Sequence, residues 1–398
     1  MISLHVIGSY PVPTDPQYEI DAHNIKIIKY THLLTEMGYV VHFYGANGCQ
    51  QHVSHTYYHP VISLNDYDEA KDLTDNFTNP EYLMIGSERL TNVKSKIEKI
   101  FATNTYNLLQ QNYKKGDLVL HFFQCYNYAG MINVRMSHGG GDWNMYEYVS
   151  FETIAYMEHE MRRIPNNNLK IVDTIHPWFD PNNFIYDPSN KYKTPTYLFL
   201  ARCHVAKGIH FFIEYSKHYL QYNFIIAGGT LDYDLETGIM NIGRLNTPED
   251  QYINLSIYPN VEYIGPVMGH AKKELLSRVT ALIQPTVYFE PCGWNAIEAM
   301  ASGTPVLVPH FGGFLDTVLN GITGYLNKPD NWIPNIERVR QIKPIDCLMH
   351  VVTNFNRDET IKSVDKFFKS IIAHTNYVRY GNNTNDYQGM EGLLVPGI

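Results

Sequence analysis

The sequence predicts an α/β protein built on parallel sheets, and three observations support this class. Short apolar runs alternate with longer amphipathic stretches through most of the chain, an order typical of successive β-α-β units. The chain has 398 residues, which is enough for two domains of ordinary size. Hydrophobic residues make up 44% and aromatic residues 13% of the chain, and this composition excludes a disordered protein.

The first half of the chain shows this alternation from its start. The opening apolar run lacks the basic segment of a signal peptide and is short enough for a strand. The first helix ends before Gly38, a residue that tolerates the left-handed conformation of a C-cap. The expected strands cover residues 4–8, 40–44, 117–123 and 132–137, and the expected helices cover residues 25–37 and 151–163.

A polar stretch at residues 179–193, rich in Asn and Pro, separates this half from a second α/β half. The chain from Tyr377 onward is again polar and irregular. We expect an N-terminal domain at 1–185, a C-terminal domain at 186–375, and a tail at 376–398 that packs back on the N-terminal domain. The second half has expected strands at 196–201, 224–227, 261–264, 281–284 and 305–309, and expected helices at 209–220, 271–277 and 294–301.

Charge and cysteine content limit the partners and the compartment. The chain has 31 Lys+Arg against 40 Asp+Glu, a formal net charge of −9, which argues against a nucleic-acid partner. The five cysteines are scattered, which favours a reducing compartment, and no apolar run is long enough for a transmembrane helix, so we expect a cytoplasmic protein. A solvated face is the first interpretation of five lysines, with peripheral contact to an acidic membrane as the alternative: Lys94, Lys96, Lys99, Lys114 and Lys115.

The strongest chemical signal lies between Gln284 and Pro305. A strand ends near Gln284, a loop carries Glu290, and a helix opens near Gly293. Such a loop is where ligands bind in open α/β sheets, and a helix start with a glycine offers N–H groups to a phosphate. Glu290 and Glu298 would accept from hydroxyls on either side of that phosphate, the layout of a nucleotide sugar. The alternative is a helix-capping acid and a solvated glutamate.

Two cations follow the first strand of the second half. Arg202 ends the strand and Lys207 precedes the next helix start, so both are expected at the same carboxyl edge of the sheet. An Arg that binds two oxygens and a Lys that acts as a point charge suit a diphosphate. Two solvated loop cations are the alternative.

Taken together, these residues resemble glycosyltransferase family 4. Arg202, Lys207 and Gly208 look like that family's Arg…Lys-Gly, and Glu290 with Glu298 matches its E-x7-E signature. The resemblance covers roughly residues 196–326. Further matches occur in the family's order: Phe224–Gly229, Val261–Val267, Phe311–Gly313 with Asp316 where the family usually has Glu, and Gly321–Leu326.

The resemblance implies a GT-B architecture, in which two Rossmann-like domains with parallel sheets face each other across a cleft. It also implies a retaining, metal-independent glycosyltransferase that moves a sugar from a UDP-, GDP- or ADP-sugar to an acceptor hydroxyl on a carbohydrate, a lipid-linked sugar or a protein. No cofactor is expected. The alternatives are a relative that hydrolyses or epimerises a nucleotide sugar, and a non-catalytic protein that binds one.

The resemblance also assigns roles to residues of the donor site. Arg202 and Lys207 would hold the diphosphate, Glu298 the ribose, and Glu290 the donor sugar, with Glu290 also placed at the catalytic centre. The backbone that follows Glu290 would enclose the sugar and phosphate, through Cys292, Gly293, Trp294 and Asn295.

The N-terminal half carries fewer matches. Gly8, after the first strand, would let the donor or acceptor approach. The active-site histidine of the family has two candidates. We favour His138, which precedes three glycines, over His121, which lies in an apolar strand where a core histidine is expected.

Two patterns resemble metal sites, and we interpret both as chance. D-x-D, which binds a metal-bound diphosphate in other glycosyltransferases, occurs at Asp66–Asp68 and Asp232–Asp234 in turn-like segments. The second pattern has a spacing that fits no common transition-metal site: Cys49, His52, His55 and His59.

Overall fold

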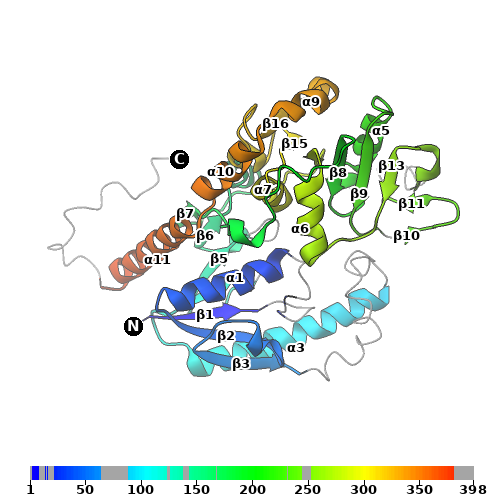
Figure 1. The fold of residues 1–398 in the computed structure, drawn as a ribbon. Helices are drawn as coiled ribbons and strands as arrows, with labels where there is room; N and C mark the ends of the chain where they lie inside the picture. The colour runs from blue at the N-terminus through cyan, green and yellow to red at the C-terminus, as the bar shows by residue number, and fades with distance from the viewer. Residues whose placement is uncertain are drawn as a thin grey trace.

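Two α/β units, each built on an all-parallel sheet, make up the protein (Figure 1). In this view the N-terminal unit lies below and the C-terminal unit above. The structure is a computed structural model that describes residues 2–8, 14, 16, 22–63, 88–122, 126–137, 143–166, 168–230, 232–243 and 252–380, without the side chains of 88–96, 379 and 380.

The N-terminal sheet has seven strands in the order β3-β2-β1-β4-β5-β6-β7. Neighbouring strands pair in parallel throughout, as the β-α-β order predicts. The strands are β1 (Ser3–Ile7), β2 (Val40–Ala46), β3 (Tyr57–Ile62), β4 (Leu118–His121), β5 (Ile132–Met136), β6 (Tyr148–Phe151) and β7 (Ile171–Thr174).

Helices α1 (Ala22–Glu36), α3 (Glu88–Asn112) and α4 (Ile154–Arg163) connect these strands. The expected helix at 151–163 starts too early, because its first residue closes the fully buried strand β6. The helix begins after Thr153, whose hydroxyl accepts a hydrogen bond from the N–H of Tyr156 and so provides the N-cap.

The C-terminal sheet has six strands in the order β13-β9-β8-β14-β15-β16, and they also pair in parallel. A small antiparallel sheet, β10-β11-β12, is inserted between β9 and β13. The parallel strands are β8 (Thr196–Leu200), β9 (Asn223–Ala227), β13 (Val261–Tyr263), β14 (Ala281–Ile283), β15 (Val306–Pro309) and β16 (Gly324–Asn327), and the inserted ones are β10 (Asp232–Tyr233), β11 (Ile239–Asn241) and β12 (Tyr252–Asn254).

Helices connect the strands of the C-terminal sheet, and the apolar faces of sheet and helices form one core. Helix α7 has the bounds that the sequence predicts, whereas α5 ends four residues before the expected 220. The helices are α5 (Ile209–Ser216), α6 (Gly269–Arg278), α7 (Trp294–Ala301), α8 (Phe314–Thr317), α9 (Trp332–Arg338) and α10 (Pro344–Asn354).

Helix α11 (Arg357–Tyr380) follows the C-terminal unit in sequence but packs on the N-terminal one. It lies beside β6 and β7 in Figure 1, drawn in orange and red. The expectation of an irregular chain from Tyr377 is wrong as far as residue 380, which is helical. Four apolar residues of α11, all fully buried, join the core of the N-terminal sheet: Val364, Phe367, Phe368 and Ile371.

In both units the order of strands reverses next to the first strand. The chain first builds outward from β1 to β3, or from β8 to β13, and then starts again on the other side with β4 or β14. The crevice at the carboxyl ends of these two central strands is the place where open α/β sheets bind ligands. The loops after β8 and β14 are the loops that the motifs single out.

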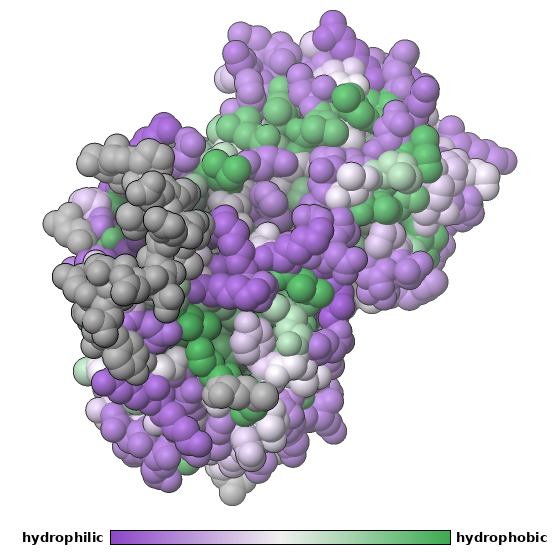
Figure 2. Space-filling model, turned by 90° about the vertical axis from the view of Figure 1, so that its left-hand side faces the viewer, coloured by the Kyte–Doolittle hydropathy of each residue, from purple (hydrophilic) through white to green (hydrophobic). Residues whose placement is uncertain are grey.

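The surface of the described residues is mixed. Figure 2 shows the side that faces left in Figure 1, and polar residues cross the middle of this face between apolar groups above and below. Apolar groups of limited size are ordinary on protein surfaces. In the described part of the chain, no helix has the length and apolar content needed to cross a bilayer.

Candidate functional site

The loop after β8 is built around a short 3₁₀ turn, Val205–Lys207. The His204 side chain caps this turn by accepting a hydrogen bond of 3.0 Å from the N–H of Ala206. Arg202, just before the turn, is exposed at the carboxyl edge of the sheet, and Lys207 ends the turn. The two cations that the sequence predicts for this edge are therefore both there.

Gly208 fixes how closely this turn approaches the loop after β14. Its φ is +77°, and a Cβ there would lie 1.9 Å from the carbonyl oxygen of Pro285. The hydroxyl of Thr286 and the N–H of Val287 then both donate to the carbonyl of Ala206, at 2.8 and 3.1 Å. Only glycine permits this contact, which fastens the two loops of the crevice together.

Lys207 and Glu290 form an ion pair between the two loops. The Lys207 Nζ lies 2.6 Å from Glu290 Oε2, and each side chain is 15% exposed. The ammonium also lies 5.0 Å from the ring centroid of Tyr288. The structure thus brings together the cation predicted for the diphosphate and the carboxylate predicted for the sugar.

The glycine loop at Gly312–Gly313 packs directly on the backbone of Glu290 and Pro291. The N–H of Gly313 donates to the carbonyl of Glu290 at 2.7 Å. A Cβ at Gly313 would lie 2.3 Å from the carbonyl oxygen of Pro291, and one at Gly312 would lie 2.9 Å from that of Glu290. The two glycines therefore allow the backbone to pack against the loop that carries Glu290, and this packing holds the loop in place.

Helix α7 begins at the expected position, where Gly293 adopts a left-handed conformation with φ 80°. A Cβ there would lie 2.3 Å from the ring of Phe314. The side chain of Asn295 donates to the carbonyl of Leu200 at 2.6 Å, which ties the start of α7 to the end of β8. Burial raises the pKa of the Cys292 thiol well above its usual range, so this thiol stays protonated.

Glu298, one turn into α7, forms an ion pair with a lysine that the sequence analysis did not identify. Its Oε2 lies 2.7 Å from Nζ of Lys272, in helix α6. Their side chains are 15% and 23% exposed, so both remain within reach of solvent. The signal available in the sequence was weak, since Lys272 lies in an ordinary amphipathic helix.

On the N-terminal side, Gly8 directly follows β1 at the switch between β1 and β4. Its N–H donates to the carbonyl of Tyr44 at 2.8 Å, and a Cβ at position 8 would lie 2.8 Å from the same oxygen. The close packing of neighbouring strand ends therefore already requires a glycine here. His138, the favoured active-site histidine, lies outside the described residues.

His121, the alternative histidine, is fully buried at the end of β4. Its Nε2 lies 3.0 Å from the side-chain oxygen of Asn133, and its ring packs on Tyr128 and Tyr146. Burial lowers the pKa of His121 to about 3. This is the environment of a core histidine.

The start of α4 contacts the C-terminal site loops, which the sequence did not indicate. The hydroxyl of Thr153 donates to the carbonyl of Pro291 at 2.6 Å. Asp316 Oδ2 accepts a hydrogen bond of 2.9 Å from the N–H of Ala155, so an acid of the C-terminal unit caps a helix of the N-terminal unit. One turn along α4, the His159 ring stacks on Phe289, with centroids 3.8 Å apart.

The structure places parts of the two metal-like sequence patterns. Asp66–Asp68 lies outside the described residues. Asp234 accepts from the N–H of Glu236 and the hydroxyl of Thr237, which makes it a turn-forming residue. Among the described residues, no group of three or more His, Cys, Asp or Glu could hold a metal ion, and the Cys49–His59 pattern therefore does not form a cluster.

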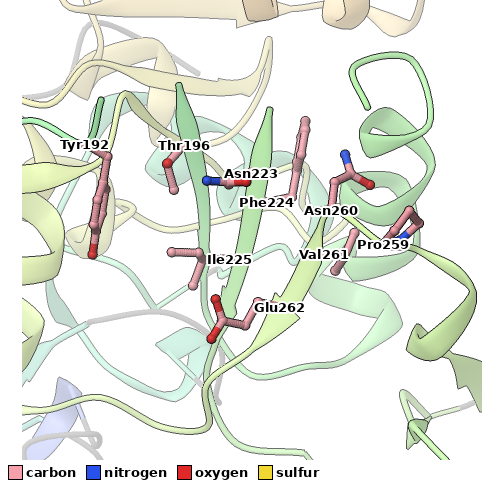
Figure 3. Close-up of a pocket in the computed structure, with 9 residues that line it drawn as sticks. All are labelled: Tyr192, Thr196, Asn223, Phe224, Ile225, Pro259, Asn260, Val261 and Glu262. Atoms are coloured by element: carbon pink, nitrogen blue, oxygen red, sulfur yellow. The ribbon is translucent and has the colours of Figure 1, made fainter. Parts of the chain in front are cut away.

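A separate pocket lies at the amino ends of the strands of the C-terminal sheet, opposite the carboxyl ends that carry the candidate site (Figure 3). Its lining includes Thr196, Asn223 and Val261, the first residues of β8, β9 and β13. Asn260 in this lining donates to the carbonyls of Ser216, Tyr219 and Tyr222, at the end of α5. The pocket is thus at the amino edge of the sheet, away from the candidate site.

Comparisons with known proteins find a matching domain family, related sequences and similar folds. Residues 183–346 match the family described as glycosyl transferases group 1. A protein from Methanocaldococcus jannaschii, described as an uncharacterized glycosyltransferase, is 30% identical over 190 residues, which cover 44% of this chain and 45% of the relative. The chain therefore spans less than half the length of that relative.

Solved structures match over almost the whole chain. Sucrose-phosphate synthase from Thermosynechococcus elongatus superposes with a TM-score of 0.63 at 16% identity, covering 94% of this chain and 100% of that one. An Anabaena protein solved in complex with UDP superposes with a TM-score of 0.59 at 14% identity, covering 93% and 100%. At this identity the likeness concerns the fold. The protein thus has the GT-B fold, and its residues 183–346 match the domain described as glycosyl transferases group 1.

Proposed function

We propose that this protein is a retaining glycosyltransferase of the family 4 type, which moves a sugar from a nucleotide-diphosphate donor to an acceptor hydroxyl without a divalent metal. The convergence of Arg202, Lys207 and Glu290 at the β8/β14 switch point carries the proposal. Two cations and one helix start suit a diphosphate, and a carboxylate beside them suits the hydroxyls of a sugar.

In the proposed mechanism these residues bind, orient and neutralise. Arg202 and Lys207 hold the diphosphate, and with the N–H groups at the start of α7 they stabilise the charge that grows on the leaving phosphate. Glu290 binds the sugar and Glu298 the ribose. The acceptor hydroxyl attacks from the face of the leaving group, and a donor phosphate oxygen takes its proton, so that no protein nucleophile is needed.

The proposal extends to the donor base, the donor sugar and the acceptor, which a panel of substrates can identify. UDP bound to the structurally similar Anabaena protein makes uridine donors the first to test. GDP- and ADP-sugars complete the panel, and acceptors include carbohydrates, lipid-linked sugars and proteins. His138 is proposed to be the active-site histidine that acts near the donor sugar.

A nucleotide-release assay tests the proposal. We expect the purified protein to release nucleotide from one nucleotide sugar only when an acceptor is added, equally with and without EDTA. NMR of the product should show the anomeric configuration of the donor. Loss of activity in EDTA would contradict metal independence, and acceptor-independent release would indicate a hydrolase. Binding without any turnover would indicate the non-catalytic alternative.

A further inference from the structure

Trp294, the first residue of α7, is held by the N-terminal unit. Its indole Nε1–H donates to Oε2 of Glu152 at 3.0 Å. Glu152 lies between β6 and α4, and its side chain is only 1% exposed. The other oxygen of this carboxylate, Oε1, lies 2.9 Å from Nζ of Lys26, in α1. One buried carboxylate thus joins a helix of each unit.

A second lysine approaches the face of the same indole ring. Lys29, one turn after Lys26 in α1, has its Nζ 5.1 Å from the ring centroid of Trp294. The same ammonium lies 4.6 Å from the rings of Trp178 and Phe179, in the connection between the units, and donates to the carbonyl of Trp178. Three aromatic rings around one ammonium form a cation–π cage.

The charges in this network compensate each other only in part. Burial lowers the pKa of Lys29 to about 8, and the nearby carboxylates of Glu298 and Glu152 favour its charged form. Burial also lowers the pKa of Lys26, against the opposing effect of Glu152. A buried ion pair of this kind contributes little net stability, but removing one member leaves the opposite charge buried and uncompensated. The arrangement therefore favours one particular placement of the units.

The network continues to Ser137, the residue that precedes the favoured histidine in the sequence. Lys26 Nζ also donates to the carbonyl of Ser137 at 3.0 Å, immediately before position 138. A continuous path of contacts therefore runs from the end of β5 through Lys26 and Glu152 to Trp294. At its other end, Trp294 is four residues after Glu290 and four before Glu298.

We propose that Trp294 is a positioning residue, whose indole side chain sets the start of the donor-site helix at a fixed place relative to the N-terminal unit. Glu152 and Lys29 hold the indole. The position of the indole in turn fixes the positions of Glu290 and Glu298, the proposed donor-binding residues before and after it in the sequence. The kinetic consequence rests on the proposed function, whereas the placement of α7 does not.

The sequence contains a signal for this network. Lys26 and Lys29 occur in a stretch of α1 with Ile27, Tyr30 and Leu33, so a helical projection places the lysines beside the apolar face. A lysine on the buried side of a helix requires a partner from elsewhere in the fold. The identity of that partner depends on the packing of the two units, which spacing along the chain does not reveal.

Trp294→Phe tests the proposal, because phenylalanine keeps an aromatic ring for Lys29 but lacks the N–H. It is also smaller than tryptophan, so the control must lose the same volume. Trp143→Phe is the control, since Trp143 Nε1–H also donates to a glutamate, Oε2 of Glu160 at 3.1 Å, in a bond that is more deeply buried and lies entirely within the N-terminal unit. We expect Trp294→Phe to lower kcat/KM for the donor about tenfold, through a higher KM, and Trp143→Phe to change it less than twofold.

Hydrogen exchange without ligand gives a readout that does not depend on the activity. Peptides that cover residues 291–297 should exchange about tenfold faster in Trp294→Phe and in Glu152→Gln, but not in Trp143→Phe. Combining Trp294→Phe with Glu152→Gln should add less than the product of the single effects. Glutamine leaves one acceptor oxygen for both Lys26 and Trp294, so the two changes weaken the same contact.

The outcomes separate the two hypotheses. Unchanged exchange at 291–297 in Trp294→Phe would overturn the placement of α7 by Trp294. Faster exchange with unchanged kcat/KM in an active enzyme would overturn the positioning role. A wild-type protein that transfers no sugar would contradict the proposed function, while its exchange would still decide whether Trp294 holds α7.

Discussion

The ammonium of Lys207 lies 2.6 Å from the carboxylate of Glu290, so that the two charges proposed to bind the donor neutralise each other in the ligand-free protein. A diphosphate that binds Lys207 must therefore compete with Glu290. The pair also keeps the two loops of the crevice in register before the donor arrives, which reduces the reorganisation that binding requires.

Glu290→Gln should separate the binding of the nucleotide from transfer of the sugar. The neutral amide releases Lys207 for the diphosphate, so we expect the affinity for a nucleoside diphosphate to stay the same or rise up to about threefold. Transfer should fall about 100-fold, because the carboxylate no longer binds the sugar hydroxyls. Calorimetry with the nucleoside diphosphate and steady-state kinetics measure the two effects. Weaker binding of the nucleoside diphosphate would contradict the competition.

Arg202→Ala should weaken binding of the nucleoside diphosphate about tenfold, the loss expected for a charge-assisted contact to phosphate. The melting temperature should stay within about 1 °C, because substitutions of exposed residues have small effects on stability. Arg162→Ala removes an exposed arginine that pairs with Glu158 on α4, and it serves as the control for the loss of one positive charge. Equal weakening of binding in the two variants would show that only net charge matters.

Gly208→Ala should destabilise the C-terminal unit by more than about 3 kcal/mol. The left-handed conformation costs alanine about 1–2 kcal/mol, and the contact with the Pro285 carbonyl adds a backbone clash. Gly321→Ala is the matched control, because Gly321 has a φ of +78° but a Cβ added there would meet nothing within 4 Å. Gly321→Ala should therefore lose only the stability that corresponds to the left-handed conformation, about 1–2 kcal/mol. Urea unfolding followed by tryptophan fluorescence measures both, and similar losses would contradict the clash.

Asp316→Ala should loosen the contact between the units, because the carboxylate caps the start of α4. We expect a loss of about 1 kcal/mol in the free energy of unfolding, because the N–H of Ala155 in the first turn loses its side-chain acceptor while Thr153 remains as the N-cap. Asp316→Asn keeps an oxygen acceptor and should recover most of this loss. Thermal unfolding compares the three proteins, and no recovery in the asparagine variant would show that the cap is not what the aspartate contributes.

The N-terminal unit should lose stability as the pH falls from about 6.5 towards 4. Burial is the main cause that lowers the pKa of His42 and His59 to about 4, and that of His121 to about 3. Between these values and 6.5 the unfolded chain binds more protons than the folded one, so the free energy of unfolding rises with pH in this window.

His42→Phe tests this pH dependence. The phenyl ring can still stack between His5 and His59, but it does not titrate. Its free energy of unfolding in urea should therefore fall less between pH 6.5 and 4.5 than that of the wild type. The difference should be under about 1.4 kcal/mol per pH unit, since the partly exposed ring is screened by water. An identical fall in both proteins would rule out a contribution from His42.

Local patterns predicted much of the fold. Helix α7 has the expected bounds, because its apolar face and the glycines that flank it, Gly293 and Gly303, are all local signals. Strand β6 was not predicted, and the expected helix at 151–163 begins on its last residue, since a short aromatic run that is buried on both faces has no alternation to identify it. Strand β3 was missed, because Pro60 within Tyr57–Ile62 argues against a strand unless the strand lies at an edge.

The candidate site also has a part that the sequence predicted and a part that it did not. The ends of β8 and β14 could be located from the sequence, so that Arg202, Lys207 and Glu290 were expected at one edge of the sheet. The partners of Glu298 and Trp294 could not be identified from the sequence. Lys272 comes from another helix, and Glu152 lies 142 residues away in the other unit. These contacts depend on how complete elements and units pack.

Helix α11 affects the order in which the protein can fold during its synthesis. The core of the N-terminal unit includes Val364, Phe367, Phe368 and Ile371, which the ribosome adds after the whole C-terminal sheet. The first unit to be made is therefore the last to complete its core, and until then it exposes the apolar surface that α11 covers. A fragment that ends at residue 185 should aggregate, and a stable N-terminal fragment requires residues 357–380 to be joined to it.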